Sequence, residues 1–484
     1  MSPENTALTE SCDAIVVGAR CAGSATAIAL ARGGRKVIAL DRSKFPSDTL
    51  STHLLFPAGV AELSYLAALD RILALDPPKI PEIVVTVEGE LEARERFTAV
   101  DGIDYGLCVP RTQLDMALVE TARDQGVEVR ERCSVKDVIW HEGRAAGVRY
   151  TDAEGVEREL RAKLVVGADG RRSTMASLLG AEQPYRASRN GRGLVFRYMD
   201  DPQAGTRWGH TMSQFRAGDT HGMAFPCPDD RMLVLFMGPA EEVREFRRDP
   251  EGTWERKVAL NPSLARRVAG ATNATKIRST PDVPAFFRAS SGPGWALVGD
   301  AGHFKDPVIA QGIRDAVRFG RLLGEQAAPH LHDPRALDQA LLRAERRRDR
   351  ECQGTYHWGN RESRAVPSSS LVVEALRQFA STTDPGFSDA FNRTRNPDRV
   401  LHLGVGAKAL LRAAARPGAD RRGLVREVVE ELRIDFDIHR ERRRDAFRST
   451  RMTRSERAFQ WPVSTDPPET ASRSRQPAAA GASA

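Results

Sequence analysis

Short apolar runs alternate with amphipathic stretches over the first 170 residues and predict a parallel β-sheet covered by helices. Residues 14–17 and 36–40 are apolar runs that end at Gly18 and Asp41, a pattern typical of strands buried on both faces. Residues 25–30 lie between them and are helix formers with apolar side chains on one side. Residues 164–166 and 295–298 repeat the buried-strand pattern, and helices are expected at 59–74, 112–125 and 311–325. The pattern predicts an α/β fold whose sheet is assembled from distant segments.

The pattern changes between residues 191 and 289. Short strand-like runs at 194–198, 209–215, 223–225 and 232–236 predict an inserted antiparallel sheet, to which 82–87 and 91–97 add further strands. After about residue 333 the chain is expected to be helical, at 335–351, 371–379, 397–415 and 424–432. The predicted divisions are a discontinuous nucleotide-binding domain (12–75, 105–190 and 290–330), a substrate domain (76–104 and 191–289), a helical C-terminal region (331–462) and disordered ends (1–11 and 463–484).

Composition indicates a reduced, soluble, cytoplasmic protein. The 484 residues carry a net charge of +7, and the six cysteines form no Cys-x-x-Cys pair, which argues against a zinc site or a disulfide framework. No metal site is expected. We find neither a signal peptide nor an apolar run long enough to span a membrane. The arginine-dense run at 440–457 favours a solvated helix face over nucleic-acid binding, because aromatic residues are sparse in it.

A glycine-rich turn follows the first strand. Its sequence, Gly18-Ala19-Arg20-Cys21-Ala22-Gly23, has arginine where a dinucleotide fingerprint has its middle glycine. The turn can place a phosphate at a helix N-terminus, where free N–H groups and the helix dipole favour anions. Arg20 either contacts that phosphate or turns outward. Asp41 follows the second strand about 20 residues later, the spacing of a ribose-binding acid, although an aspartate there is commonly only a turn residue.

Two further strand ends carry an acid, at Asp169-Gly170 and at Gly299-Asp300. Together with the glycine turn they resemble the motifs of the FAD-dependent aromatic hydroxylase superfamily, the class A flavoprotein monooxygenases of the para-hydroxybenzoate hydroxylase fold. The stretch 164–173 is similar to the family's Asp-Gly motif, and 299–312 is similar to its Gly-Asp motif. The resemblance covers roughly residues 12–350.

The resemblance implies a Rossmann-like FAD-binding domain with an inserted antiparallel substrate domain. FAD is the implied cofactor, and NAD(P)H and O2 are the implied co-substrates. The reduced flavin of this family takes up O2 as a C4a-hydroperoxide and hydroxylates a small or polycyclic organic substrate, here expected to be aromatic. The residues expected to hold FAD are Gly18, Arg20, Gly23, Asp41, Arg42, Arg111, Asp169, Asp300, Pro307 and Gly312. Arg42 is equally compatible with a solvated charge.

Two residues are candidates for contact with the substrate. His53 lies in a loop expected to approach the flavin and could act as a general base for a phenol, although a structural histidine is the commoner case. Arg197, on the first strand of the middle sheet, could face substrate or nicotinamide, and an exposed strand charge is equally plausible. His303 and Phe304, beside the Gly-Asp motif, could face the flavin or be structural.

Other functions stay open. An FAD-dependent reductase or dehydrogenase of the same fold, acting on an isoprenoid or another natural product, is the main alternative. Flavin-dependent halogenases resemble this topology, but the Trp-x-Trp-x-Ile-Pro motif is not found in this sequence. A nucleic-acid or carrier-binding protein that uses the basic C-terminal region is a third interpretation. The sequence specifies neither the substrate, the choice between NADH and NADPH, nor the oligomeric state.

Overall fold

The computed structural model describes residues 10–89, 91–281, 283–382, 385–400, 403–449, 451–458 and 461. The disorder predicted for the two ends falls outside these residues, except at Glu10 and Ser11. These two residues form β1 (Glu10–Ser11), which pairs in parallel with β11 (Glu157–Arg161). The prediction is wrong there because the two residues complete the edge of a small sheet.

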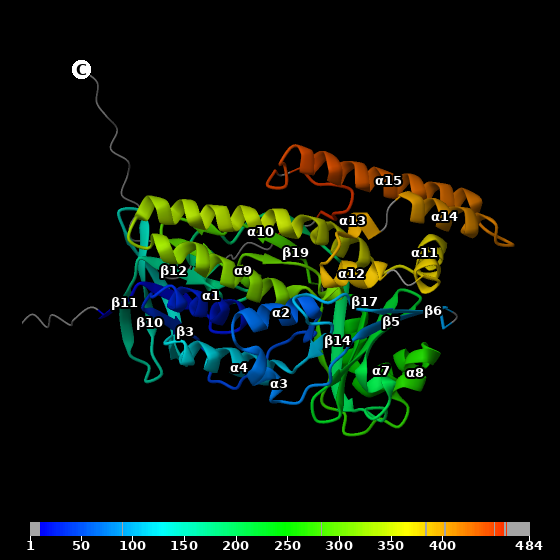
Figure 1. Cartoon of the computed structure of the whole chain (residues 1–484), viewed down its shortest axis with the longest axis horizontal. Coiled ribbons are helices and arrows are strands. Elements are labelled where there is room, and N and C mark those ends of the chain that lie inside the picture. Colours follow the sequence, from blue (N-terminus) through cyan, green and yellow to red (C-terminus); the bar gives the residue numbers. More distant parts are fainter. Residues whose placement is uncertain are drawn as a thin grey trace, which may run out of the picture.

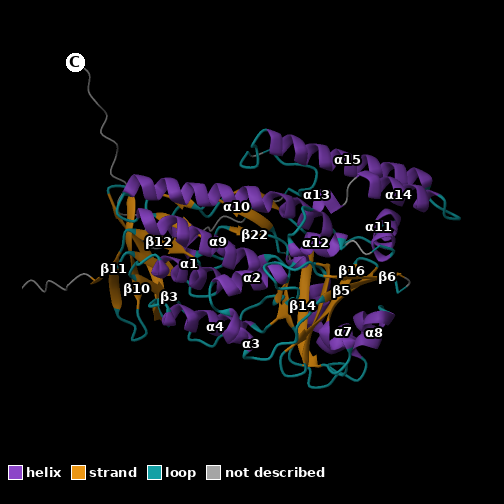
Figure 2. Ribbon diagram, viewed as in Figure 1, coloured by secondary structure: helices purple, strands orange, loops and turns teal. Residues whose placement is uncertain are grey.

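The molecule has two parts, each built around one large sheet, and a parallel sheet forms the centre of one of them (Figures 1 and 2). Its strands β8, β3, β2, β12 and β21 run parallel, and β20 adds an antiparallel edge. The predicted buried strands are confirmed, since every residue of β2, β3 and β12 is buried. The six strands in spatial order are β20 (Ser291–Gly292), β21 (Trp295–Leu297), β12 (Leu164–Gly167), β2 (Ala14–Val17), β3 (Val37–Leu40) and β8 (Glu128–Arg130).

Helices cover one face of this sheet and a β-meander covers the other. The helices are α1 (Cys21–Arg32), α4 (Arg111–Asp124) and α9 (Gly312–Ala327), and the meander is β9 (Ser134–His141), β10 (Arg144–Thr151) and β11. Helices α1 and α9 touch along glycines: a Cβ on Gly320 would lie 2.5 Å from the Ala22 carbonyl oxygen, and one on Gly324 would lie 2.6 Å from Ala29 Cβ. The contact places the start of α9 beside the glycine turn. Short α5 (Thr174–Leu178) follows β12.

A seven-stranded sheet forms the centre of the other part of the molecule. It is antiparallel apart from the parallel pair β15–β5. In spatial order the strands are β18 (Arg278–Thr280), β14 (Arg192–Asp200), β17 (Arg231–Pro239), β16 (Thr220–Cys227), β15 (Thr211–Ala217), β5 (Glu82–Val87) and β6 (Leu91–Arg96). One face packs on α6 (Glu242–Arg248), α7 (Pro250–Ala259) and α8 (Pro262–Val268). The other face packs on α11 (Ser370–Ala380), α12 (Gly386–Asn392) and α13 (Pro397–Val400).

The C-terminal helices lie along the outside of both halves. Helix α10 (Pro334–Glu362) spans the parallel-sheet part, and α14 (Leu403–Ala414) and α15 (Arg421–Arg443) lie at the outer edge (Figure 1). A small sheet of β13 (Pro184–Ser188), β19 (Ala285–Arg288) and β22 (His303–Phe304) links the halves, and β4 (Leu54–Leu55) pairs with β7 (Leu107–Cys108). No helix among the described residues combines the length and the apolar composition that crossing a membrane requires.

Several helices differ from their predicted limits. Helix α10 continues to Glu362 where 351 was expected, and the stretch 397–415 contains two helices, α13 and α14. The helix expected at 59–74 is interrupted, forming α2 (Pro57–Tyr65) and α3 (Leu69–Leu73), because Ala67 takes a φ of +58° between them. Helix α15 is more than twice as long as predicted. Its outer side carries exposed apolar residues where an amphipathic helix is expected to be polar, so the sequence pattern marks only part of it.

Candidate active site

A cavity of about 560 Å³ runs between the end of the parallel sheet and the seven-stranded sheet. Its walls come from the glycine turn, the loop that follows β3, the start of α4, the turn after β12 and the segment 300–316. Nine of the twelve predicted site residues line it, namely Gly18, Arg20, Asp41, Arg42, Arg111, Asp169, Asp300, Pro307 and Gly312. Segments that are far apart in the sequence therefore meet at one site.

Gly18 and Gly23 make the glycine turn possible. Gly18 has a φ of +99°, and a Cβ on it would lie 2.5 Å from the Ala168 carbonyl oxygen. A Cβ on Gly23 would lie 1.7 Å from the carbonyl oxygen of Gly18 itself. The two glycines let the turn close tightly against β12, so that α1 begins at the cavity. Gly23 supports the turn from behind and does not line the cavity.

Arg20 and Arg111 share one carboxylate. Arg20 lies 2.5 Å from Asp115 and also donates to the Ser47 carbonyl oxygen at 3.0 Å. Arg111 donates to Asp115 through two nitrogens, at 2.9 and 3.0 Å. Burial opposes the charge of Arg111, but Cys21 and Asp115 raise the pKa of its guanidinium. Arg20 thus turns toward protein groups, where it ties the loop after β3 to α4, while part of its side chain still lines the cavity.

The carboxylates of Asp41 and Asp169 each stabilise a turn by accepting hydrogen bonds. Asp41 accepts hydrogen bonds from the N–H groups of Ala19, at 2.7 Å, and Ser43, at 2.8 Å. Asp169 accepts from the Ser173 hydroxyl at 2.6 Å and the Met175 N–H at 3.0 Å. These bonds give each carboxylate a local structural role at the cavity wall. The ribose contact expected of Asp41 stays a prediction.

Asp300 and the start of α9 form the other end of the cavity. Burial raises the pKa of Asp300, while the Arg171 and Arg111 guanidiniums act in the opposite direction. Gly312 is the first residue of α9, and a Cβ built on it would meet no atom within 4 Å. The missing side chain leaves space directly in front of a helix N-terminus, which favours a group with negative charge or hydrogen-bond acceptors.

His53 lies behind the cavity wall. Its neighbours Thr52 and Leu54 line the cavity, but His53 is fully buried and does not. Its Nε2 lies 2.8 Å from the Tyr198 hydroxyl, and Nδ1 has no hydrogen-bond partner among the described residues. Burial and the charge of Arg111 lower the pKa of His53 to about 3. An imidazole with so low a pKa is a weak general base at neutral pH, so the geometry does not support the predicted role.

Arg197 does not line the cavity and lies on the other face of β14, so the geometry does not support its predicted contact with substrate or nicotinamide. Its guanidinium pairs with both oxygens of Glu251, at 2.6 and 2.8 Å, and stacks over Trp254 at 5.0 Å. Side chains alternate along a strand, and Arg197 shares the α7-covered face of β14 with Val195. Both faces of β14 are buried, so its sequence does not reveal which face meets the cavity.

Sequence reasoning missed several residues at the Asp300 end. Arg171 and Lys305 line the cavity, and Arg171 stacks over Phe304 with 5.2 Å to the ring centroid. Lys305 contacts the Asp315 carboxylate and donates to the Cys352 thiol at 3.3 Å. Both residues lie within the stretches that resemble the family motifs, Arg171 in 164–173 and Lys305 in 299–312, so their position in the sequence could have indicated them.

A buried cluster lies behind Lys305. His303, Asp315 and Cys352 are close enough to one another to hold a metal ion. The Lys305 ammonium already supplies a positive charge to this group through its contacts with Asp315 and Cys352. His303 is buried there and does not line the cavity, whereas Phe304 does.

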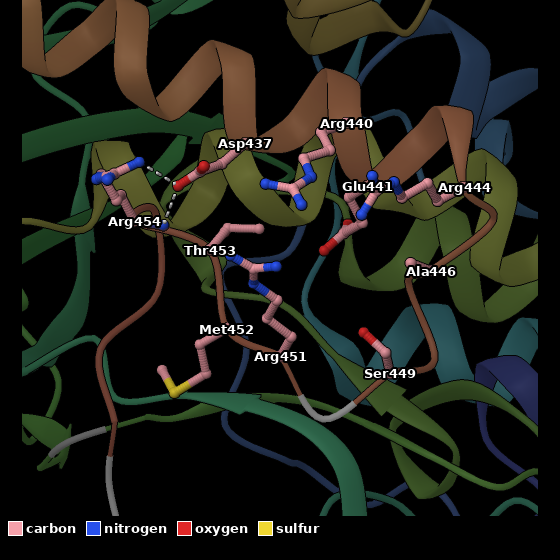
Figure 3. A pocket seen from close by; sticks show the side chains of 10 residues that line it. All are labelled: Asp437, Arg440, Glu441, Arg444, Ala446, Ser449, Arg451, Met452, Thr453 and Arg454. Atoms are coloured by element: carbon pink, nitrogen blue, oxygen red, sulfur yellow. Dashed lines mark hydrogen bonds and ion pairs between the residues drawn. The ribbon is translucent and has the colours of Figure 1, made fainter.

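A second cavity, of about 340 Å³, lies between the end of α15 and residues 446–454 (Figure 3). None of the predicted cofactor-binding residues lines it. It contains arginines and an ion pair of 2.8 Å between Asp437 and Arg454. It is therefore separate from the candidate active site.

Comparison with known proteins matches the chain to the FAD binding domain family over residues 11–355. The menaquinone reductase of Mycobacterium tuberculosis is 29% identical over 328 residues, which cover 65% of this chain and 76% of that protein. Digeranylgeranylglycerophospholipid reductase 1 of Methanopyrus kandleri is 27% identical over 380 residues, 75% of this chain and 93% of that protein. The myxobacterial chondrochloren halogenase superposes with a TM-score of 0.66 at 22% identity, over 83% of this chain and 96% of that one.

Proposed function

This chain belongs to the FAD binding domain family, and from that premise we propose that it is an FAD-dependent monooxygenase that uses NAD(P)H and O2. The proposed substrate is a small or polycyclic organic molecule. The observation that carries the proposal is the cavity of about 560 Å³, which joins the glycine turn to the face of the seven-stranded sheet. A cavity of this form can hold an elongated dinucleotide with one end against a substrate-binding wall.

The residues along the cavity fit FAD. The glycine turn and the N-terminus of α1 suit the pyrophosphate, because backbone N–H groups there favour anions. Arg42 and Arg111 add positive charge along the same wall. At the other end, the open space at Gly312 and the N-terminus of α9 suit the polar edge of the flavin. Pro307 and Asp300 lie beside that space.

The cofactor supplies the redox chemistry, and the protein binds it, orients the substrate and keeps water out. Leu54, Leu194, Val283 and Ala310 give the Asp300 end an apolar lining. The sheet face behind this lining continues into a buried core that includes Phe56, Phe196 and Met212. An apolar wall of this kind suits a hydrophobic substrate and strengthens electrostatic interactions in the site. Tyr198 and His53 hold the segment 51–54 against the sheet as positioning residues.

Reduction of a lipid-soluble molecule is the second candidate. It is favoured by the names of two curated relatives, a menaquinone reductase and a digeranylgeranylglycerophospholipid reductase, each 27–29% identical to this chain. The same apolar lining would accept an isoprenoid chain. The two candidate reactions differ in the product: the monooxygenase incorporates an oxygen atom from O2 into it, and the reductase gives a saturated product without that oxygen.

Purification of the full-length protein with FAD, followed by turnover under ¹⁸O2, tests the proposal. A yellow protein that binds FAD and oxidises NAD(P)H faster with a phenol or polycyclic aromatic, giving an ¹⁸O-labelled product, supports the monooxygenase. Anaerobic formation of a saturated product without label supports the reductase. A protein that purifies colourless and takes up no FAD rules out both.

A further inference from the structure

Helix α15 carries an exposed apolar stripe along its outer side. The stripe consists of Val425, Val429, Leu432 and Phe436, which are 57%, 39%, 47% and 66% exposed. Spacings of four, three and four residues place them on one side of the helix, over about 16 Å at 1.5 Å per residue. The opposite side is buried against the protein through Leu424, Ile434 and Ile438. The helix thus has two apolar sides, and the protein covers one of them.

Arginines border the stripe. Arg426 and Arg433 each follow a stripe residue directly, and both are exposed. Neither guanidinium has a hydrogen-bond or ion-pair partner within the described part of the chain. Long arginine side chains beside an apolar surface can reach past it to a charged layer. The outward surface of α15 is therefore both apolar and cationic.

The acidic residues of α15 are mostly occupied on its other sides. Glu431 contacts Arg361, and Asp435 pairs with the same arginine at 3.1 Å. Asp437 pairs with Arg454 at 2.8 Å. These pairs offset part of the negative charge that α15 carries near the arginines beside the stripe.

Positive charge continues past the end of the stripe. One turn beyond Phe436, Arg440 points into the cavity of about 340 Å³ that also contains Arg444 and Arg451 (Figure 3). The ion pair within this cavity joins Asp437 to Arg454 and leaves those three guanidiniums unengaged among the described residues. Glu441 also lines this cavity, but it is paired with Arg186, so the lining keeps a net positive charge. A net positive hollow beside exposed apolar residues matches the phosphate and acyl parts of an anionic lipid.

We propose that the outer side of α15 binds the surface of an anionic lipid bilayer, with the stripe entering the interface and the arginines contacting lipid phosphates. The pattern is that of an interfacial amphipathic helix, which lies along a membrane without crossing it. Charge disfavours a second copy of the chain as the occupant. Antiparallel pairing along this stripe would bring Arg426 and Arg433 against the same residues of the other copy.

The test uses the full-length protein loaded with FAD in vesicle flotation. Wild type binds vesicles of equal parts phosphatidylglycerol and phosphatidylcholine at least tenfold more tightly than vesicles of phosphatidylcholine alone, and 0.5 M NaCl weakens the binding. The variant Leu432→Gln/Phe436→Gln loses at least tenfold in affinity for the phosphatidylglycerol vesicles, with FAD content and melting temperature unchanged. Leu260→Gln is the matched control, since Leu260 is 69% exposed at the end of α7, far from α15 (Figure 1), and this variant keeps wild-type binding.

Three results would overturn the proposal. Wild type fails to float with phosphatidylglycerol vesicles, or the stripe variant floats as well as wild type. Alternatively, light scattering shows a dimer that the stripe variant converts to a monomer, which would identify the stripe as an interface between two copies. Because these readouts need no catalytic turnover, they are independent of the proposed monooxygenase reaction.

Discussion

Arg20 and Asp115 are 95 residues apart in the sequence and form an ion pair of 2.5 Å beside the glycine turn. Asp115 is completely buried and also pairs with Arg111, whereas the Arg20 side chain is 22% exposed. The arginine that replaces the middle glycine therefore anchors the wall of the site through α4. Its side chain has a structural function that a glycine could not provide.

Removing Asp115 should destabilise the protein far more than removing Arg20. Asp115→Asn leaves the buried Arg111 without its counter-charge, and we expect a loss of about 3–5 kcal/mol in the free energy of unfolding. Arg20→Ala removes a partly exposed partner, and we expect about 1 kcal/mol. Urea unfolding of the two single variants and the double variant measures both losses and their coupling. Equal losses in the two single variants would contradict this account.

Filling the space at Gly312 should block FAD. Gly312→Leu places a side chain in the cavity at the start of α9, where a Cβ would meet no atom within 4 Å. We expect FAD affinity to fall by at least about tenfold, or ~1.4 kcal/mol. Flavin fluorescence titration of the apoprotein measures it. The control is Gly205→Leu, since Gly205 also has open space around it but does not line the cavity. A normal FAD affinity for Gly312→Leu would place the flavin elsewhere.

Arg197→Gln should leave the active site intact. Arg197 contacts Glu251 and Trp254 on the face of β14 away from the cavity. We expect FAD affinity and the rate of NAD(P)H oxidation to stay within about twofold of wild type, while Trp254 fluorescence changes because its cation–π partner is lost. A large loss of turnover at unchanged stability would restore Arg197 as a substrate contact.

Tyr198 follows Arg197 on β14 and lies on the opposite face, so we expect Tyr198→Phe to affect the cavity wall. It removes the hydroxyl that lies 2.8 Å from His53 Nε2. The segment 51–54 then loses its polar anchor to the sheet, and we expect a fall of about tenfold in substrate-stimulated NAD(P)H oxidation, ~1.4 kcal/mol. FAD affinity should remain near that of wild type. An unchanged stimulated rate would show that the pair does not position the cavity wall.

The buried His53 should make stability fall in acid. Its folded-state pKa is lowered from 6.5 to about 3, so between these pH values the unfolded chain binds a proton that the folded protein does not. Stability from this residue is complete above pH 6.5 and is lost as pH falls toward 3, by up to ~1.4 kcal/mol per pH unit. His53→Asn should remove the contribution of one proton from the slope of unfolding free energy against pH. Asparagine tolerates the φ of +64° found at this position. Parallel stability–pH curves for wild type and variant would refute the assignment.

Much of the nucleotide-binding half was predictable because its signals are local. A buried strand that ends in glycine or aspartate constrains the backbone within a few residues, and β2, β3 and β12 appear where the pattern placed them. The side-chain partners were not predictable, since Asp115 and Arg20 meet only through tertiary packing. The orientation of Arg197 could not be predicted for another reason. Both faces of β14 are buried, so alternation along the strand could not separate Arg197 from Tyr198.

The glycine-lined contact between α1 and α9 has a consequence for how the protein is made. Helix α1 leaves the ribosome first, but the glycines of α9 that fit against it, Gly320 and Gly324, follow about 300 residues later. At a synthesis rate of about 5–20 residues per second, roughly 15–60 seconds pass between the synthesis of α1 and that of α9. During that interval an apolar helix face and half of a binding site are exposed on the nascent chain. The site is therefore completed late in synthesis, and a chaperone that shields α1 would protect it until α9 arrives.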